Sequence, residues 1–139
     1  MIDKTVSKKI TSYFTSRTDT IAVYLFGSTA KGKERKNSDL DLAVLFEERL
    51  DQNQRFQTKL QITNDLEDCL KRKIDLVDLR SADLFFIHQI MRNKVLLFER
   101  DTYGRVAFEV DYRKRYFDHM PTLKQYYRQS RKRLREREA

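Results

Sequence analysis

A glycine–serine pair followed at a fixed distance by two aspartates is the strongest chemical signal in the sequence. Gly27 and Ser28 end a short apolar run, and after ten intervening residues Asp39 and Asp41 open the next one. Residues two apart on a strand point to the same side, so these carboxylates leave one face with their Cβ atoms about 7 Å apart. Mg²⁺ prefers carboxylate oxygens as protein ligands. The pattern predicts that Asp39 and Asp41 bind metal.

The residues before the aspartates are suited to holding phosphate. Gly27 lacks a Cβ atom, so its backbone can approach a polyphosphate closely. Ser28 supplies a hydroxyl and a backbone N–H where we expect a helix to begin, and anions are favoured at helix N-termini. A third carboxylate, Asp75, interrupts the apolar segment 73–79. Two Mg²⁺ ions about 4 Å apart can bind a nucleoside triphosphate and activate an attacking hydroxyl, with Asp75 as a further ligand or a general base.

Apolar periodicity defines the elements that must position these side chains. Along the predicted strand 39–46, one face carries Leu40, Leu42, Val44 and Phe46. The other face begins with Asp39 and Asp41. The predicted fold is α+β, a small mixed sheet of three or four strands flanked by helices. Helices are predicted over 4–17, 51–71, a segment beginning near 81, 106–119 and 122–137, and strands over 21–26, 39–46, 73–79 and 95–98.

Several single residues receive structural rather than chemical interpretations. Asp78 lies three residues after Asp75, so we expect it on the opposite side of the strand in a surface role. Ser81 is expected to cap the following helix, with Asp83 only a charge in the first turn. The lone cysteine, Cys69, excludes an intramolecular disulfide and is expected to pack as a small core residue. His88 is expected to be a packed or half-exposed helix residue.

The segment GSTAKGKERKNSDLDL, residues 27–42, resembles the GSx10DxD signature of the nucleotidyltransferase superfamily related to DNA polymerase β. The size of the chain points to the minimal nucleotidyltransferase group. Ser38 matches the SDxD context that is frequent in this family, and Gly32 matches its GSxARG context. Lys31 stands where arginine is common, which keeps a phosphate-attracting charge and loses the bidentate fork. The resemblance therefore adds Lys31 and Ser38 to Gly27 and Ser28 as nucleotide-binding residues.

The resemblance also implies a function. With 139 residues, the chain is too short to add a separate acceptor-binding domain to this core. Minimal nucleotidyltransferases of this size resemble the antitoxins of HEPN/MNT toxin–antitoxin pairs. The implied reaction is Mg²⁺-dependent transfer of AMP from ATP to a tyrosine of a HEPN ribonuclease toxin, with release of pyrophosphate. Asp39, Asp41 and Asp75 would be both the catalytic residues and the metal ligands.

The net charge of +8 is concentrated near the C-terminus. Residues 111–139 hold ten Lys or Arg against four Asp or Glu, and tyrosines and a phenylalanine are interleaved with the basic residues. We divide the chain into a minimal nucleotidyltransferase domain over 1–110 and a helical basic extension over 111–139 that is not an independent domain. The extension is expected to dock on an acidic or mixed surface of the toxin; a solvated helix is the plainer alternative.

Other interpretations of the whole chain stay open. The protein could act without catalysis by occluding its partner, or regulate through nucleic acid bound by the basic extension. A degenerate site that kept the pattern but lost activity is another alternative. In a purely structural reading Gly27 and Ser28 form a plain turn, but this leaves Asp41 and Asp75 unexplained inside apolar strands. No apolar run is long enough to cross a bilayer, so we expect a cytoplasmic protein without membrane contacts.

Overall fold

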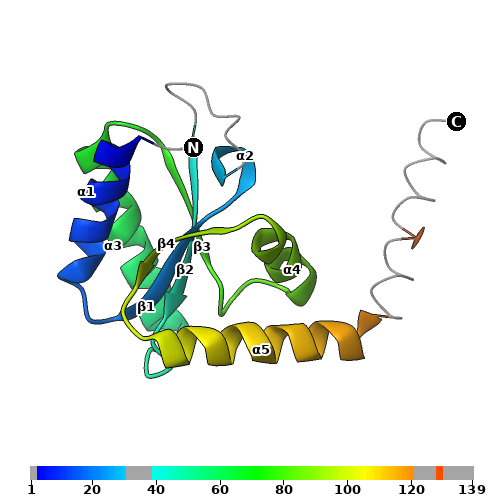
Figure 1. Cartoon of the computed structure of the whole chain (residues 1–139). Coiled ribbons are helices and arrows are strands. Elements are labelled where there is room, and N and C mark those ends of the chain that lie inside the picture. The colour runs from blue at the N-terminus through cyan, green and yellow to red at the C-terminus, as the bar shows by residue number, and fades with distance from the viewer. Residues whose placement is uncertain (1–2, 31–38, 121–127, 130–139) are drawn as a thin grey trace, which may run out of the picture.

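Helices and strands alternate along the chain around a four-stranded sheet (Figure 1). The computed structural model describes residues 3–30, 39–120 and 128–129. The order of helices and strands along the chain confirms the predicted α+β fold. The elements are α1 (Lys4–Thr15), β1 (Thr20–Leu25), α2 (Gly27–Ala30), β2 (Leu40–Phe46), α3 (Gln52–Leu70), β3 (Ile74–Asp78), α4 (Leu84–Arg92), β4 (Val95–Glu99) and α5 (Thr102–Asp118).

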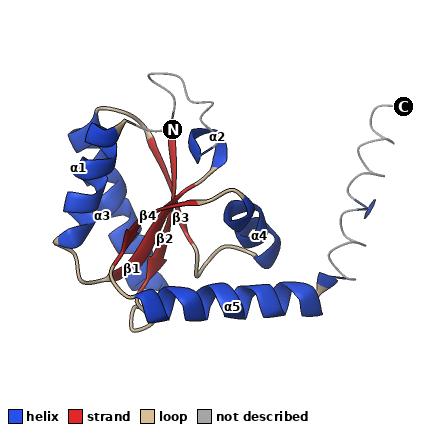
Figure 2. Ribbon diagram, in the orientation of Figure 1, coloured by secondary structure: helices blue, strands red, loops and turns tan. Residues whose placement is uncertain are grey.

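The sheet is mixed, as expected. Its strand order is β3-β2-β1-β4, with β1 antiparallel to both β2 and β4 and with β2 parallel to β3. The central strands β1 and β2 are almost wholly buried, because helices cover both faces of the sheet (Figure 2). The single parallel pair is the feature that brings the start of β2 beside the start of β3.

Each face of the sheet has its own hydrophobic core. One core joins α1 and α3 to the β2 side chains Leu40, Leu42 and Val44, and the other joins α4 and α5 to Ala43 and Leu45. This confirms the predicted alternation of β2. From Leu42 onward, β2 carries apolar residues on both faces. Its polar side chain, Asp41, therefore lies near the end where the strand begins.

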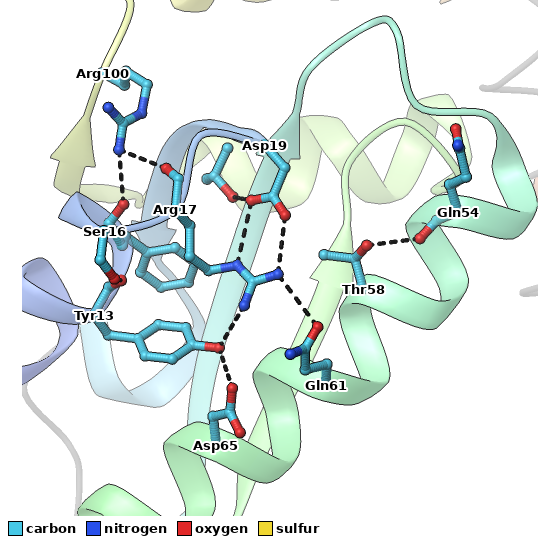
Figure 3. Close-up of polar contacts among 11 residues, drawn as sticks. Tyr13, Ser16, Arg17, Asp19, Gln54, Thr58, Gln61, Asp65 and Arg100 are labelled. Atoms are coloured by element: carbon cyan, nitrogen blue, oxygen red, sulfur yellow. Dashed lines mark hydrogen bonds and ion pairs between the residues drawn. The ribbon is translucent and has the colours of Figure 1, made fainter.

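A polar network ties α1 and α3 together beside the first core (Figure 3). The Tyr13 hydroxyl donates to Asp65 Oδ2 at 2.6 Å and accepts from Arg17, whose guanidinium also pairs with Asp19 at 3.0 Å. Burial and the bond to Asp65 raise the pKa of Tyr13 to about 12. Arg100, just after β4, donates to the backbone carbonyls at the end of α1. The network fixes α1 against the sheet far from the predicted site.

The helix predicted over 106–119 begins earlier than expected. The sequence predicts a start at Val106, whereas α5 begins at Thr102 with Asp101 as its N-cap, accepting a hydrogen bond from the Gly104 N–H at 3.1 Å. A Cβ atom on Gly104 would lie 2.6 Å from Asp101 Oδ2. Glycine, a helix breaker by propensity, is therefore used here to fit the cap.

The expectation that Asp78 has a surface role is wrong. Asp78 is 8% exposed, accepts hydrogen bonds from the Arg80 backbone and the Ser81 hydroxyl, and forms an ion pair with Arg55 at 2.9 Å. Ser81 is therefore committed to this turn and does not cap α4. The N-cap is Asp83, which accepts from the Phe86 N–H. Asp78 organises the connection that leaves β3.

Two further packing predictions have opposite outcomes. Cys69 is exposed, contrary to expectation, because it lies in the last turn of α3 and faces an open hollow beside polar α1 residues such as Lys8 and Ser12. His88 is half-buried, as expected, and stacks on Tyr116 of α5 with ring centroids 3.8 Å apart. Burial and nearby Arg92 lower the pKa of His88.

The predicted boundary between residues 110 and 111 falls within α5, which continues to Asp118 and buries Tyr112 against the sheet. The predicted helix over 122–137 lies outside the described residues except for positions 128 and 129, which are helical. The division into domain and extension therefore stays a prediction. In the part of the chain that the structure describes, no helix is long and apolar enough to cross a membrane.

Candidate active site

The glycine of the predicted phosphate-binding turn has a conformation that other residues rarely adopt. Gly27 directly follows Phe26 at the end of β1 and has φ +68°. The Phe26 N–H donates to the Asp41 carbonyl at 3.0 Å, so the antiparallel pairing of β1 with β2 extends to this turn. Gly27 and Ser28 then open α2, which agrees with the expected helix start.

The close approach of the Asp41 carboxylate also requires a glycine at position 27. A Cβ atom at this position would lie 2.4 Å from Asp41 Oδ2 and 3.1 Å from Asp41 Cγ. The carboxylate of Asp41 therefore occupies the space that a side chain on residue 27 would need. The signature joins the two residues physically: the glycine makes room for the aspartate that the signature contains.

Asp41 and Asp75 lie side by side. They are register partners in the parallel pairing of β2 with β3, and neighbouring strands in a sheet are about 4.8 Å apart. Registered residues on parallel strands point to the same face of the sheet. Asp41 is half-buried and Asp75 is exposed, so the pair opens to solvent at the start of both strands. The structure thus brings together two of the three predicted carboxylates.

Asp39, the remaining carboxylate, is exposed and directly precedes β2. Its charge acts on Asp41 together with that of Asp75: burial and repulsion from these two aspartates raise the pKa of Asp41. Clustered carboxylates that disfavour one another's ionised form are stabilised by a bound cation. The electrostatics at the start of β2 therefore favour a positively charged ligand.

The described residues do not form a ready-made metal cluster. Within residues 3–30, 39–120 and 128–129, no group of three or more His, Cys, Asp or Glu side chains is arranged closely enough to hold an ion. The roles assigned to Asp39, Asp41 and Asp75 as metal ligands therefore stay predictions. Lys31 and Ser38, the two nucleotide-binding residues that rest on the family context alone, lie outside the described residues.

An aromatic pair that the sequence analysis did not single out borders the glycine turn. Phe26 contacts Phe86 of α4 edge to face, with ring centroids 6.3 Å apart, and Phe86 is 40% exposed. The sequence signal was a phenylalanine placed directly before the Gly27–Ser28 turn. The contact links α4 to the end of β1 and gives the site an apolar wall beside its carboxylates.

The sequence and the fold of this chain are similar to those of known nucleotidyltransferases. The family model described as Polymerase beta, Nucleotidyltransferase matches residues 8–103. Protein adenylyltransferase MntA of Shewanella oneidensis is 39% identical over 69 residues, 50% of this chain and 47% of the relative. A probable protein adenylyltransferase MntA of Haemophilus influenzae is 37% identical over 79 residues, 57% of this chain and 67% of the relative. The alignment thus spans about half the length of the Shewanella relative.

The same fold occurs in a solved complex. A crystal structure of a toxin–antitoxin with AMP-PNP contains a chain that superimposes with a TM-score of 0.71 at 27% identity. The superposition covers 89% of this chain and 96% of the other. The likeness therefore extends beyond residues 8–103 to most of the two chains.

Proposed function

This chain belongs to the polymerase beta nucleotidyltransferase family, and from that premise we propose that it is a protein adenylyltransferase antitoxin. Its substrates are ATP and a tyrosine of a HEPN ribonuclease toxin, and modification of that tyrosine neutralises the toxin. The observation that carries the proposal is the registered pair Asp41 and Asp75 beside Gly27, at the position of the family's signature. The proposed use of ATP favours a cytoplasmic location for this protein.

The site residues suit a divalent metal ion. The donor set consists only of carboxylates, which hard cations such as Mg²⁺ prefer. The raised pKa of Asp41, caused by burial and by Asp75 and Asp39, supports the fit because a cation would relieve that repulsion. Asp39, Asp41 and Asp75 would hold the ion. When bound, Mg²⁺ neutralises charge on the triphosphate and lowers the pKa of the attacking hydroxyl.

The chain's own residues then have distinct tasks. The backbone around Gly27 and Ser28 receives the phosphates, with Lys31 and Ser38 as further nucleotide-binding residues. Asp75, the exposed member of the registered pair, faces the acceptor and takes the phenolic proton as the tyrosine oxygen attacks the α-phosphorus. A new P–O bond joins AMP to the tyrosine, the bond between the α-phosphorus and the bridging oxygen breaks, and pyrophosphate leaves.

The relatives support the choice of reaction and partner. Both curated proteins that match this chain are named as protein adenylyltransferases, one of them as probable. The solved chain with a TM-score of 0.71 comes from a toxin–antitoxin complex crystallised with AMP-PNP, an ATP analogue.

The experiment that tests the proposal uses the full chain and its cognate toxin. The two proteins are incubated with Mg²⁺ and ATP, CTP, GTP or UTP in separate reactions, and the intact mass of the toxin is measured. We expect the toxin to gain the mass of AMP in the reaction with ATP and no mass with CTP, GTP or UTP. Peptide mapping should locate the added AMP on a tyrosine. An unmodified toxin that is nevertheless inactive in the complex would instead favour neutralisation by occlusion.

A further inference from the structure

Helix α5 carries an apolar stripe on its outward face. Tyr103 is 85% exposed, Val106 42%, Val110 53% and Phe117 62%. Their separations of three, four and seven residues place them along one side of a helix. The opposite side is the buried one, where Phe108 and Tyr112 pack into the second core. α5 is thus apolar on two sides, and the sheet covers only one of them.

The stripe lies at the far end of the molecule from the active site. The first turn of α5 packs where β1 begins, since a Cβ on Gly104 would lie 3.5 Å from Ile21. The other end of β1 leads to Gly27, about 20 Å away for a strand of this length. Figure 1 shows the same arrangement, with α5 and α2 at opposite ends of the sheet. A protein bound at the stripe therefore does not cover the carboxylates of the same chain.

The stripe is symmetric about Val110. Tyr103 and Phe117 lie seven residues before and after it, and Val106 and Lys114 lie four residues before and after it. In an antiparallel pair with a two-fold axis at Val110, the two Val110 side chains meet. Tyr103 of each copy then meets Phe117 of the other, and the Lys114 methylene chain covers Val106. Such self-complementarity is what a two-fold interface between identical chains requires.

The charges of α5 select the antiparallel orientation. Arg113, Lys114 and Arg115 form one basic run in the second half of the helix. Only Lys114 of this run lies on the stripe, because Arg115 turns to its ion-pair partner Asp111 at 3.1 Å. A parallel pair would place the two Lys114 ammonium groups against each other, whereas an antiparallel pair places each beside Val106. It also brings Asp118 of one copy to the level of Thr102, in the first turn of the other. Negative charge is favoured at that end of a helix.

We propose that the outward face of α5 binds the same face of a second copy of this chain, forming an antiparallel helix pair around Val110. The dimer leaves both active sites free at its two outer ends, so that each can receive a toxin. Because one helix face per partner buries less than the area of a standard interface, the dimer is weak and depends on concentration. The inference concerns self-association and does not rest on the proposed reaction.

Cross-linking tests the position of the axis. In a Cys69→Ser background, which removes the single native cysteine, Val110→Cys places two thiols at the two-fold axis. We expect a disulfide-linked dimer under mild oxidation. Leu60→Cys in the same background is the matched control, because Leu60 is an apolar residue of α3 with a similar exposure of 47%. Equal cross-linking of both variants, or none of Val110→Cys, would overturn the proposal.

Sedimentation tests the association itself with the full-length protein alone. The wild-type chain should show a monomer–dimer equilibrium, and Val110→Asp should raise the dissociation constant at least tenfold by placing two carboxylates at the axis. Leu60→Asp should leave the constant unchanged, and circular dichroism should show that all three proteins are folded. A wild-type chain that stays monomeric up to several hundred micromolar contradicts the proposal. If Val110→Asp then also loses toxin binding, the toxin occupies this face instead.

Discussion

The Asp41 carboxylate fills the space that a side chain on residue 27 would occupy. The site therefore depends on glycine at this position. Gly27→Ala would place a methyl group 2.4 Å from Asp41 Oδ2 at a φ of +68°. We expect the carboxylate to move and AMP transfer to be lost, while the free energy of unfolding falls by about 1–2 kcal/mol from the backbone strain. Transfer assays and urea denaturation of the same preparation measure the two effects, and retained transfer would separate Gly27 from the function of Asp41.

The ionised side chain of Asp41 lowers the stability of the folded protein. Because its pKa is raised in the folded state, ionised Asp41 disfavours folding, and stability is lost as the pH rises through that pKa. Asp41→Asn should therefore melt at a higher temperature than the wild type at pH 7 without Mg²⁺. The gain should vanish below about pH 3, where aspartate is protonated in both the folded and the unfolded state. A mutant that is less stable at neutral pH would contradict the repulsion described here.

At the scale of elements, the parallel pairing of β2 with β3 gives Asp75 its place. Asp75→Asn keeps the shape of the side chain and removes its ability to accept a proton. We expect transfer to fall at least about a hundredfold, the usual contribution of a general base, while binding of Mg²⁺-ATP is largely retained. Calorimetric titration with a non-hydrolysable ATP analogue separates the two effects. Loss of nucleotide binding equal to the loss of transfer would make Asp75 a metal ligand only.

The turn from β3 to α4 depends on one buried acid. Asp78→Ala removes the partner of Arg55, whose side chain is only 13% exposed, and frees the Ser81 hydroxyl and the Arg80 N–H. Breaking a buried ion pair from one side costs about 3–5 kcal/mol. Asp111→Ala is the control, because Asp111 pairs with Arg115 at an exposed position and should cost less than about 1 kcal/mol. Chemical denaturation curves of both variants would show whether the two losses differ as expected.

Asp41 and Asp78 show how much of the structure could be predicted from the sequence and where the prediction failed. The two-residue period of a strand was sufficient to place Asp41 on the face opposite Leu40, and the family signature predicted that Gly27 adjoins the site. Which strand lies beside β2, and in which register, depends on pairing between distant segments, so the contact of Asp41 with Asp75 could not be derived from periodicity. Asp78 was misplaced because the period gives a side and says nothing about the turn residues that cover it.

At the scale of the molecule, the carboxylates and the exposed apolar stripe of α5 lie at opposite ends of one sheet. The carboxylates are found where β2 and β3 begin, and the stripe of α5 lies near the start of β1. The extension over 111–139 is predicted to dock on the toxin, but its first residues, 111–118, belong to α5 and would lie in the proposed dimer contact. Docking on the toxin would then fall to residues after 118, most of which lie outside the described ranges, so it stays a prediction. An enzyme with its active site at one end can modify a bound protein while a second contact holds the assembly together.

The aspartates of the signature are expected to be essential for the transfer of AMP from ATP to the toxin. The direct measurement is the intact mass of the toxin after incubation with Mg²⁺-ATP and either the wild-type chain or Asp41→Asn. We expect the wild type to add AMP and the variant to be slower by at least about a thousandfold, because a ligand of the metal is lost. The variant should remain folded and bound to the toxin. Near wild-type transfer by Asp41→Asn, or no AMP on the toxin with the wild type, would contradict the account.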